Sequence, residues 1–547
     1  MKKDAGKKDA ETRRRGDAES FPCPRVSVSP RLPVLLLPLA LGLLTFLLYL
    51  PSLWSGFVYD AEAQILIGDY LHDHSHFADV LTFRVLAQDV LDGNRPVQLL
   101  SLMTDSLLWG KNPVGYHLTS NLLHAGNVVL LFLLLVRLCP QGLSSRLAAC
   151  AAALIFAAHP VLVEPVAEVS SREDSLAAFF LLIFLLLADL WATGKASNWA
   201  LAGSLVAVVL SCGAKETGVA APFLILFCGL LFRGETPLRR WLVAAGGALV
   251  LTTSFLAARF ALQPAQSEIF LHKPQYLADS FPALLQIQSF IWAFLIRAIF
   301  LPLGLSADYV PQNIFALSKL GLLSILGLFL IFQILAAWKS RLAAFGMAVF
   351  WLGLAPVSNF IPIYRPVADR YLYLPMIGLA MIVCGVLVFT VRWRAVYATL
   401  LALTACAIVG LATQTVRREA VFANSLNLWT DTFAKSPFSD TAANNLGYAL
   451  FQKGDYAQAL QIFQKALNLT NGKKPNVWAG AAVTLEKLGR PADAEMALSK
   501  AIELEAIYAD PAQMVKSLLV TQEQADIIRE ILRRKSLKSP AGGEAAP

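Results

Sequence analysis

The stretch Leu50–Asp69, LPSLWSGFVYDAEAQILIGD, lies where a long apolar segment ends and the first polar loop begins. It carries two carboxylates, Asp60 and Glu62, directly after a run of apolar and aromatic side chains. This position puts the carboxylates at the surface of a bilayer, where burial and neighbouring charges can shift a pKa. We predict that Asp60 is a catalytic base, with Glu62 as a second catalytic carboxylate. The alternative is that Asp60 only marks a loop on the water side.

The composition indicates a polytopic membrane protein. Of the 547 residues 56% are hydrophobic and 15% are charged, whereas soluble domains carry about 25% charged residues. The net charge of +8 comes largely from a basic N-terminus and short basic loops, the distribution expected on the cytoplasmic side of a membrane. We therefore expect residues 1–31 to be a basic cytoplasmic tail and exclude a nucleic-acid partner.

The apolar segments between residues 32 and 413 predict a helical transmembrane domain, because a spanning helix needs about 20 apolar residues. If residues 281–302 crossed the membrane, the basic loops near residues 340 and 393 would lie outside, against the positive-inside tendency. We therefore expect 281–302 to be an interfacial or re-entrant helix, which leaves about 11 spans. The long outer loops are then the expected place for chemistry.

The composition changes after residue 413, and residues 414–534 predict a helical domain on the same side as Asp60. Gly454 and Gly489, and likewise Ala459 and Ala494, recur at a spacing of about 35 residues, close to the tetratricopeptide (TPR) period of about 34. This pattern predicts two repeats, at about 440–473 and 475–508. We expect the polar tail 535–547 to be disordered.

The second outer loop concentrates charge in HPVLVEPVAEVSSREDSLAA, residues 159–178. The residues of this loop that could support the acceptor or the site are His159, Glu164, Arg172 and Asp174. A serine that caps the following helix, with carboxylates in its first turn, would explain part of the cluster without any substrate.

Cations in the outer loops could bind a phosphate. Arg365 and Arg370 lie in SNFIPIYRPVADRYLYLP, residues 358–375, and the planar guanidinium suits two phosphate oxygens. Lys215 and Arg95 are further candidates, although Lys215 could pair with an adjacent glutamate and Arg95 could be an interfacial arginine at a helix end.

These carboxylates and cations suit one reaction. A lipid-phosphate sugar would place its phosphate on the cations, and Asp60 would take the proton of an acceptor hydroxyl that attacks the sugar with inversion. The HDHSHF segment, residues 72–77, lacks the further ligands that a designed metal site needs. We therefore expect no metal and no cofactor beyond the lipid-linked sugar.

Three ordered segments carry a resemblance to a known family: GFVYDAEAQIL (56–66), FAAHPVLVEPVAEVSSREDSLAAFFLL (156–182) and PVSNFIPIYRPVADRYLYLPMIGL (356–379). They resemble the transmembrane-and-tetratricopeptide O-mannosyltransferases and their bacterial relatives, a branch of the GT-C glycosyltransferase fold. The similarity covers roughly residues 40 to 510.

The resemblance implies transfer of mannose from a polyprenyl or dolichyl phosphate to Ser or Thr of exported proteins, with the repeats recruiting the acceptor protein. It implies a multi-pass protein of a bacterial inner membrane, or of the ER membrane in a eukaryote, with the active site and the repeats on the extracytoplasmic side. Asp60 matches the first carboxylate of the family's acidic pair, but residue 61 is alanine, so the role of Glu62 is open. The alternatives are a non-catalytic scaffold, a transferase acting on a glycolipid or surface polysaccharide, and a transporter of lipid-linked sugars.

Overall fold

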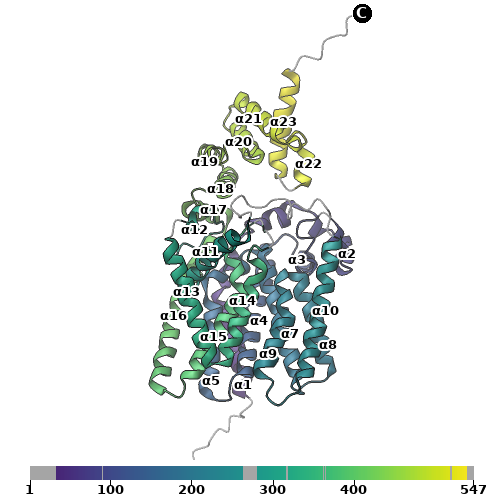
Figure 1. Cartoon of the computed structure of the whole chain (residues 1–547). Helices are drawn as coiled ribbons and strands as arrows, with labels where there is room; N and C mark the ends of the chain where they lie inside the picture. The colour runs from purple at the N-terminus through teal and green to yellow at the C-terminus, as the bar shows by residue number, and fades with distance from the viewer. Residues whose placement is uncertain are drawn as a thin grey trace, which may run out of the picture.

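The computed structural model describes residues 32–88, 90–262, 280–315, 318–360, 363, 365–517 and 520–538, and every regular element within them is helical (Figure 1). The predicted all-helical architecture, a membrane bundle followed by a helical repeat domain, is confirmed. The expected cytoplasmic tail, residues 1–31, lies outside the described residues. Of the expected tail 535–547, residues 535–538 belong to a helix and the rest lie outside the described part of the chain.

Long apolar helices build the bundle, because backbone groups in a bilayer must be hydrogen-bonded within the segment itself. The helices of the bundle are α1 (Leu32–Leu48), α4 (Pro113–Leu138), α5 (Leu143–Ala158), α7 (Glu173–Ala192), α8 (Asn198–Ala214), α9 (Ala221–Phe232), α10 (Leu238–Leu262), α13 (Lys319–Lys339), α14 (Arg341–Leu354), α15 (Tyr373–Thr390) and α16 (Arg394–Val421). Within the described residues, seven helices are long and apolar enough to cross a membrane, or eight if a bent pair forms one span, and four shorter apolar helices accompany them.

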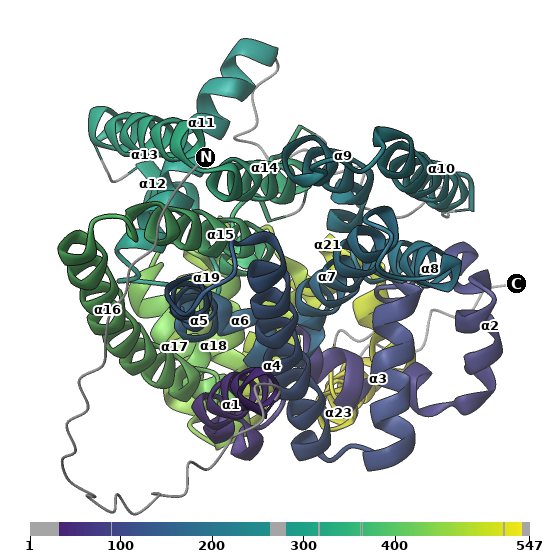
Figure 2. The ribbon, with the colours of Figure 1, turned by 90° about the horizontal axis from the view of Figure 1, so that it is seen from below.

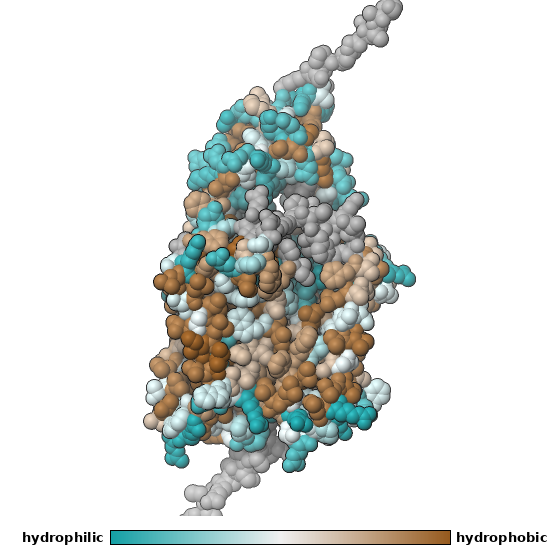
Figure 3. Space-filling view, in the orientation of Figure 1, coloured by the Kyte–Doolittle hydropathy of each residue, from teal (hydrophilic) through white to brown (hydrophobic). Residues whose placement is uncertain are grey.

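Many apolar side chains of the bundle helices are exposed. On α16 the side chains of Leu403 and Val409 are 60% and 69% exposed, and Figure 3 shows brown, hydrophobic residues covering the middle of the molecule between bluer ends. A continuous apolar surface of this kind is unfavourable in water and marks contact with lipid. The bundle is therefore a membrane domain.

Small residues let two helices of the bundle approach closely. A Cβ atom added at Gly346 of α14 would lie 2.5 Å from the carbonyl oxygen of Gly378 on α15, and the reverse substitution would meet the same obstacle. Membrane helices use such glycine pairs to bring backbones into contact. This contact fixes α15, whose outer end carries Arg370.

The basic loops gather at one end of the bundle. Arg137, at the end of α4, donates to Asp189 over 2.6 Å, and Tyr397, at the start of α16, donates to the carbonyl oxygen of Ser144 over 2.8 Å. These contacts join loops that the charge pattern assigned to the cytoplasmic side.

Helix α11 (Phe281–Phe300) lies along the opposite end of the bundle, which the charge pattern predicts to face outward and which we call the outer end. It is long and apolar enough to cross a membrane, but Trp292 donates to Ser358 over 2.9 Å and His159 donates to the Ile299 carbonyl oxygen over 2.8 Å. Ser358 and His159 both belong to outer loops, so the second half of α11 stays at this end. Figure 2, which looks along the bundle, shows α11 from the side and α5 end-on. With α11 set aside, the described bundle has the eleven helices given above, the predicted number of spans. By length and composition alone α11 is itself a candidate span, so its interfacial position stays a prediction.

Short helices complete the outer end and carry the site. They are α2 (Phe77–Leu81), α3 (Pro96–Trp109), α6 (Glu164–Ala167) and α12 (Pro311–Phe315), with a π-helical turn at Glu62–Ile67 and 3-10 turns at Val169–Arg172, Glu216–Ala220 and Asp369–Leu372. The segments that hold the predicted site residues therefore meet at one end of the bundle.

The repeat domain stands on that same end (Figure 1). Its helices are α17 (Ser425–Lys435), α18 (Asp440–Lys453), α19 (Tyr456–Leu469), α20 (Pro475–Lys487), α21 (Pro491–Leu504), α22 (Pro511–Lys516) and α23 (Gln522–Lys538). Phe463 is fully buried and contacts the backbone at Gly447 and Gly480, where a Cβ atom would lie within 2.7 Å of the ring. Helix α16 runs through residue 414 to Val421, so the membrane domain passes into the repeats by a continuous helix.

Candidate functional site

Asp60 begins a short helical turn immediately after Tyr59, whose φ of +61° is rare for a bulky residue. The Tyr59 ring stacks on Trp429 at 5.3 Å, and the Arg365 guanidinium lies 4.7 Å from the same ring. These contacts hold Tyr59, and with it the start of the turn that carries Asp60. Strained backbone maintained in this way is typical of functional sites.

The Asp60 carboxylate is solvent-exposed, and within the described residues its side chain makes no hydrogen bond or ion pair. Water reaches this group although protein surrounds it on most sides, and that partial burial raises its pKa to about 6. The positive charge of Arg370 opposes the rise, whereas Asp92, Glu173 and Glu164 add to it. Asp60 is thus an available carboxylate whose pKa responds to the charge of Arg370.

Arg370 lies at the outer end of α15 and is paired with Glu164 of α6. Its guanidinium donates to one oxygen of Glu164 and its backbone N–H donates to the other over 3.2 Å. The guanidinium also lies 5.5 Å from the centre of the Tyr371 ring. Glu164, predicted as a supporting residue, therefore positions Arg370.

Lys215 reaches the same tyrosine from another helix. Its ammonium group lies 5.5 Å from the centre of the Tyr371 ring and is paired with Asp174 and, at 3.5 Å, with Glu173. The Tyr371 hydroxyl donates to the carbonyl oxygen of Arg365 over 2.6 Å. Tyr371 thereby connects three predicted cations, from residues 215, 365 and 370, in one cluster.

Arg95 stands at the edge of this cluster, at the start of α3. Its guanidinium lies 3.3 Å from Asp92, 3.4 Å from Glu173 and 3.7 Å from Glu216. Three carboxylates therefore surround the charge of Arg95, which makes it a link between outer loops.

Arg365 differs from the other cations because its environment disfavours its charge. Its guanidinium lies 3.2 Å from Asp308, but burial and the nearby charge of Arg370 lower its pKa to about 9. An anion placed beside Arg365 would relieve that unfavourable environment.

Glu62 points away from this cluster. Its carboxylate accepts a hydrogen bond of 2.5 Å from Ser425 of α17, and burial raises its pKa. Glu62 therefore connects the Asp60 segment to the repeat domain.

Arg172 is fully buried between helices. Its guanidinium donates to Asp105 at 2.5 Å, to Ser101 at 2.9 Å, to Ser120 at 3.0 Å and to the Tyr116 carbonyl oxygen at 2.7 Å. With every branch of the side chain occupied, Arg172 fastens the N-terminus of α7 to α3 and α4. His159 is likewise buried and bonds to α11, so both residues have structural contacts.

The sequence prediction missed the acidic partners that complete the cluster. Asp92 belongs to no recognisable sequence motif. Its left-handed backbone conformation, with a φ of +56°, is seen only in the folded structure. Asp308 joins the repeat domain to the site, since it accepts from Ser439 at 2.5 Å and from Arg365. Asp369 could have been singled out because it directly precedes Arg370 in the sequence. In the structure it accepts a 2.7 Å hydrogen bond from the Tyr309 hydroxyl.

Comparison with known proteins supports the predicted resemblance. A tetratricopeptide repeat family model matches residues 438–505. The chain is 24% identical over 442 residues to Protein O-mannosyl-transferase F38B6.6 of Caenorhabditis elegans, covering 78% of this chain and 61% of that protein. It is 26% identical over 468 residues to Protein O-mannosyl-transferase TMTC4 of Homo sapiens, covering 74% and 61%.

A third relative matches over a shorter stretch but with a higher sequence identity. Over 193 residues the chain is 32% identical to Protein O-mannosyl-transferase Tmtc1 of Drosophila melanogaster, covering 34% of this chain and 21% of that protein. The chain thus spans less than two thirds of the length of these relatives.

One solved structure extends the comparison. The chain is similar to ArnT from Cupriavidus metallidurans bound to undecaprenyl phosphate, with a TM-score of 0.42 and 15% sequence identity over 85% of this chain and 80% of that one. The sequence relatives carry the conclusion: the chain is a relative of the transmembrane-and-tetratricopeptide protein O-mannosyl-transferases, as its sequence predicted.

Proposed function

We propose that the protein is a membrane glycosyltransferase that moves a sugar, mannose by its relatives' names, from a polyprenyl or dolichyl phosphate to a Ser or Thr hydroxyl of an exported protein. The observation that carries this proposal is the exposed Asp60, whose side chain has no hydrogen-bond or ion-pair partner among the described residues and whose pKa the charge of Arg370 lowers. The relatives named protein O-mannosyl-transferases support the same reaction class.

Asp60 acts as the general base in this proposal. The acceptor hydroxyl attacks C1 of the sugar, the bond from C1 to the phosphate oxygen breaks, and the hydroxyl proton passes to the Asp60 carboxylate. The configuration at C1 inverts, and the donor leaves as a lipid phosphate. A pKa of about 6 keeps most of Asp60 ionised at neutral pH while making it more basic than an ordinary aspartate.

Arg365 is our first choice for the residue that binds the phosphate. The leaving lipid phosphate carries more negative charge than the donor diester, so a cation beside it stabilises the transition state more than the ground state. Arg365 contacts the Tyr59 ring, adjacent to Asp60, and its lowered pKa is the mark of a cation that an anion would stabilise. Arg370 and Lys215, each paired with carboxylates, then supply the surrounding positive field.

The active site and the repeats share the outer end of the bundle, opposite the basic loops. The positive-inside tendency favours a position outside the cytoplasm for that end. The proposed acceptor is therefore a protein that has already crossed the membrane.

Glycoproteomics of cells with and without this chain tests the proposal. We expect hexose on Ser or Thr of exported proteins in cells carrying the wild type or Asp79→Asn, and its loss in cells carrying Asp60→Asn. Asp79 lies on the same outer segment, and an asparagine there can still accept the hydrogen bond that Gln88 donates at 3.0 Å. Hexose that persists in Asp60→Asn cells would remove the catalytic assignment.

A further inference from the structure

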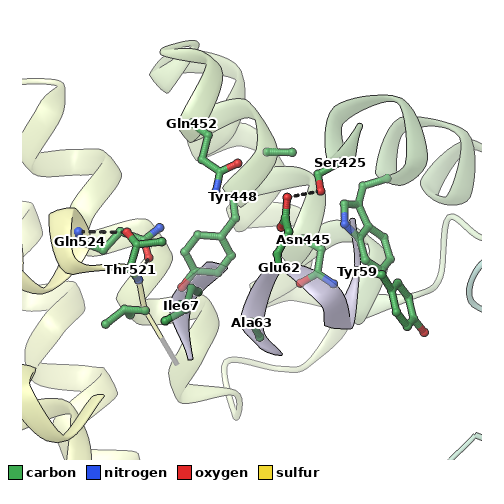
Figure 4. Close-up of a pocket in the computed structure, with 13 residues that line it drawn as sticks. Tyr59, Glu62, Ala63, Ile67, Ser425, Asn445, Tyr448, Gln452, Thr521 and Gln524 are labelled. Atoms are coloured by element: carbon green, nitrogen blue, oxygen red, sulfur yellow. Dashed lines mark hydrogen bonds between the residues drawn. The ribbon is translucent and has the colours of Figure 1, made fainter. Parts of the chain in front are cut away.

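A cavity of about 140 Å³ separates the Asp60 segment from the repeat domain (Figure 4). Tyr59, Glu62 and Ile67 line it from the membrane domain, and the repeat side contributes α17, α18 and the start of α23. Its volume is about ten times the ~10–15 Å³ that admits one water molecule. Space therefore exists directly beside the segment that carries the proposed base.

The chemistry of this cavity differs from that of the cation cluster. The polar groups contributed by the repeat side are amides and hydroxyls, from Ser425, Asn445, Tyr448, Gln452, Thr521 and Gln524. Among the described residues that line it, none is basic, and Glu62 is the single acid. A phosphate would find no cation here, whereas the amide and hydroxyl groups match the N–H and C=O groups of a polypeptide.

Several of these side chains keep a hydrogen-bonding group free to meet a ligand. Asn445 accepts at its carbonyl oxygen from Asn444 over 3.0 Å, which leaves its NH₂ group for another partner. Gln524 accepts from the backbone N–H of Thr521 over 2.9 Å, with the same result. Figure 4 shows Gln524 on the opposite side of the view from Glu62, with Gln452 between them and Asn445 beside Glu62.

A second cavity extends the opening along the outer segment. It holds about 560 Å³, shares Ile67 with the first, and lies between the segment from Gln64 to His76 and α22. The two cavities are neighbours through Ile67, and each is bounded by the membrane domain on one side and by the repeat domain on the other, which suits an extended ligand.

We propose that an extended segment of the acceptor polypeptide binds between the repeat domain and the Asp60 segment. Asn445, Gln452 and Gln524 bind the backbone of this segment. Glu62 favours uncharged or basic residues on either side of the acceptor Ser or Thr. This inference rests on the proposed function and adds to it the position and chemical character of the acceptor site. The acceptor would then lie beside Tyr59 and Glu62, the neighbours of Asp60 in sequence that line the cavity, and the donor phosphate beside Arg365.

Charge substitution at Gln452 tests the proposal. The full-length protein is reconstituted with polyprenyl-phosphate mannose, and transfer is measured to three synthetic peptides with one central Thr flanked by Gly and Ala, by Lys, or by Asp. For the wild type we expect the Asp-flanked peptide to have the highest KM. Gln452→Lys should raise the KM of the Lys-flanked peptide and lower that of the Asp-flanked peptide, each by about tenfold, the equivalent of ~1.4 kcal/mol.

Gln464→Lys is the matched control, because Gln464 is an exposed residue of the same repeat that does not line the cavity. It should leave all three KM values unchanged. Asn445→Ala, which adds no charge, should raise the KM of all three peptides by a similar factor.

Equal peptide KM values in the wild type, Gln452→Lys and Asn445→Ala would overturn the acceptor site. Transfer by the wild type to a glycolipid but to none of the peptides would also overturn it, and lipid-phosphate donor chemistry would stand. Failure of the wild type to consume the donor at all would instead refute the proposed function.

Discussion

The pH dependence of transfer reports directly on Asp60. With a pKa of about 6, the carboxylate is ionised to about 90% at pH 7 and about 10% at pH 5. A base must be ionised to act, so kcat/KM for transfer should fall about tenfold from pH 7 to pH 5, with a midpoint near pH 6. An ordinary aspartate would give a midpoint near pH 4.

Two substitutions should move that midpoint in opposite directions. Asp92 raises the pKa of Asp60 and Arg370 lowers it. We call the loss of kcat/KM on the acid side of the pH profile the acid limb. Asp92→Asn should shift the midpoint of this limb to lower pH by on the order of one pH unit. Arg370→Gln should shift the midpoint, measured on whatever activity this variant retains, to higher pH by a similar amount. Asparagine tolerates the left-handed conformation at residue 92.

The assay is initial-rate transfer from polyprenyl-phosphate mannose by protein in proteoliposomes between pH 4.5 and 8, with Asp79→Asn as the control that should leave the limb in place. An acid limb that neither Asp92→Asn nor Arg370→Gln moves would refute the assignment of that limb to Asp60.

Three further predictions concern structural residues and the second carboxylate. Arg172→Met should leave Asp105 buried without its partner and cost about 3–5 kcal/mol, visible as a lower Tm in detergent; an unchanged Tm would contradict its role. Glu62→Gln keeps an acceptor for Ser425, so donor hydrolysis without acceptor should stay within about threefold of the wild type, whereas a catalytic Glu62 would require a loss of about 10²-fold or more. Gly346→Leu should separate α14 from α15 and reduce the yield of folded protein measured by size exclusion, whereas Gly327→Leu, a glycine with open space around it, should not.

The sequence predicted the helical bundle well because apolar length alone defines membrane spans. It also predicted an interfacial α11, because a crossing there would place two basic loops outside, and the contacts of Trp292 and His159 at one end of the bundle are consistent with that prediction. The repeats were visible because small residues recur at Gly454 and Gly489 with nearly the tetratricopeptide spacing.

The partners within the site could not be predicted in this way. Arg370 and Glu164 are 206 residues apart in the chain, and no local pattern relates them. Arg172 resembled a site residue in sequence because it stands in a charged loop, but the fold buries it against Asp105. Contacts of this kind depend on how distant helices pack, which a periodic pattern does not encode.

The most direct test of the account is to separate donor binding from turnover. Binding of polyprenyl-phosphate mannose and its single-turnover transfer are measured for the wild type, Asp60→Asn and Arg365→Gln. We predict that Asp60→Asn binds the donor with wild-type affinity and transfers no sugar, and that Arg365→Gln binds it at least tenfold more weakly. Transfer by Asp60→Asn, or wild-type donor affinity in Arg365→Gln, would contradict a site in which this carboxylate is the base and this arginine holds the phosphate.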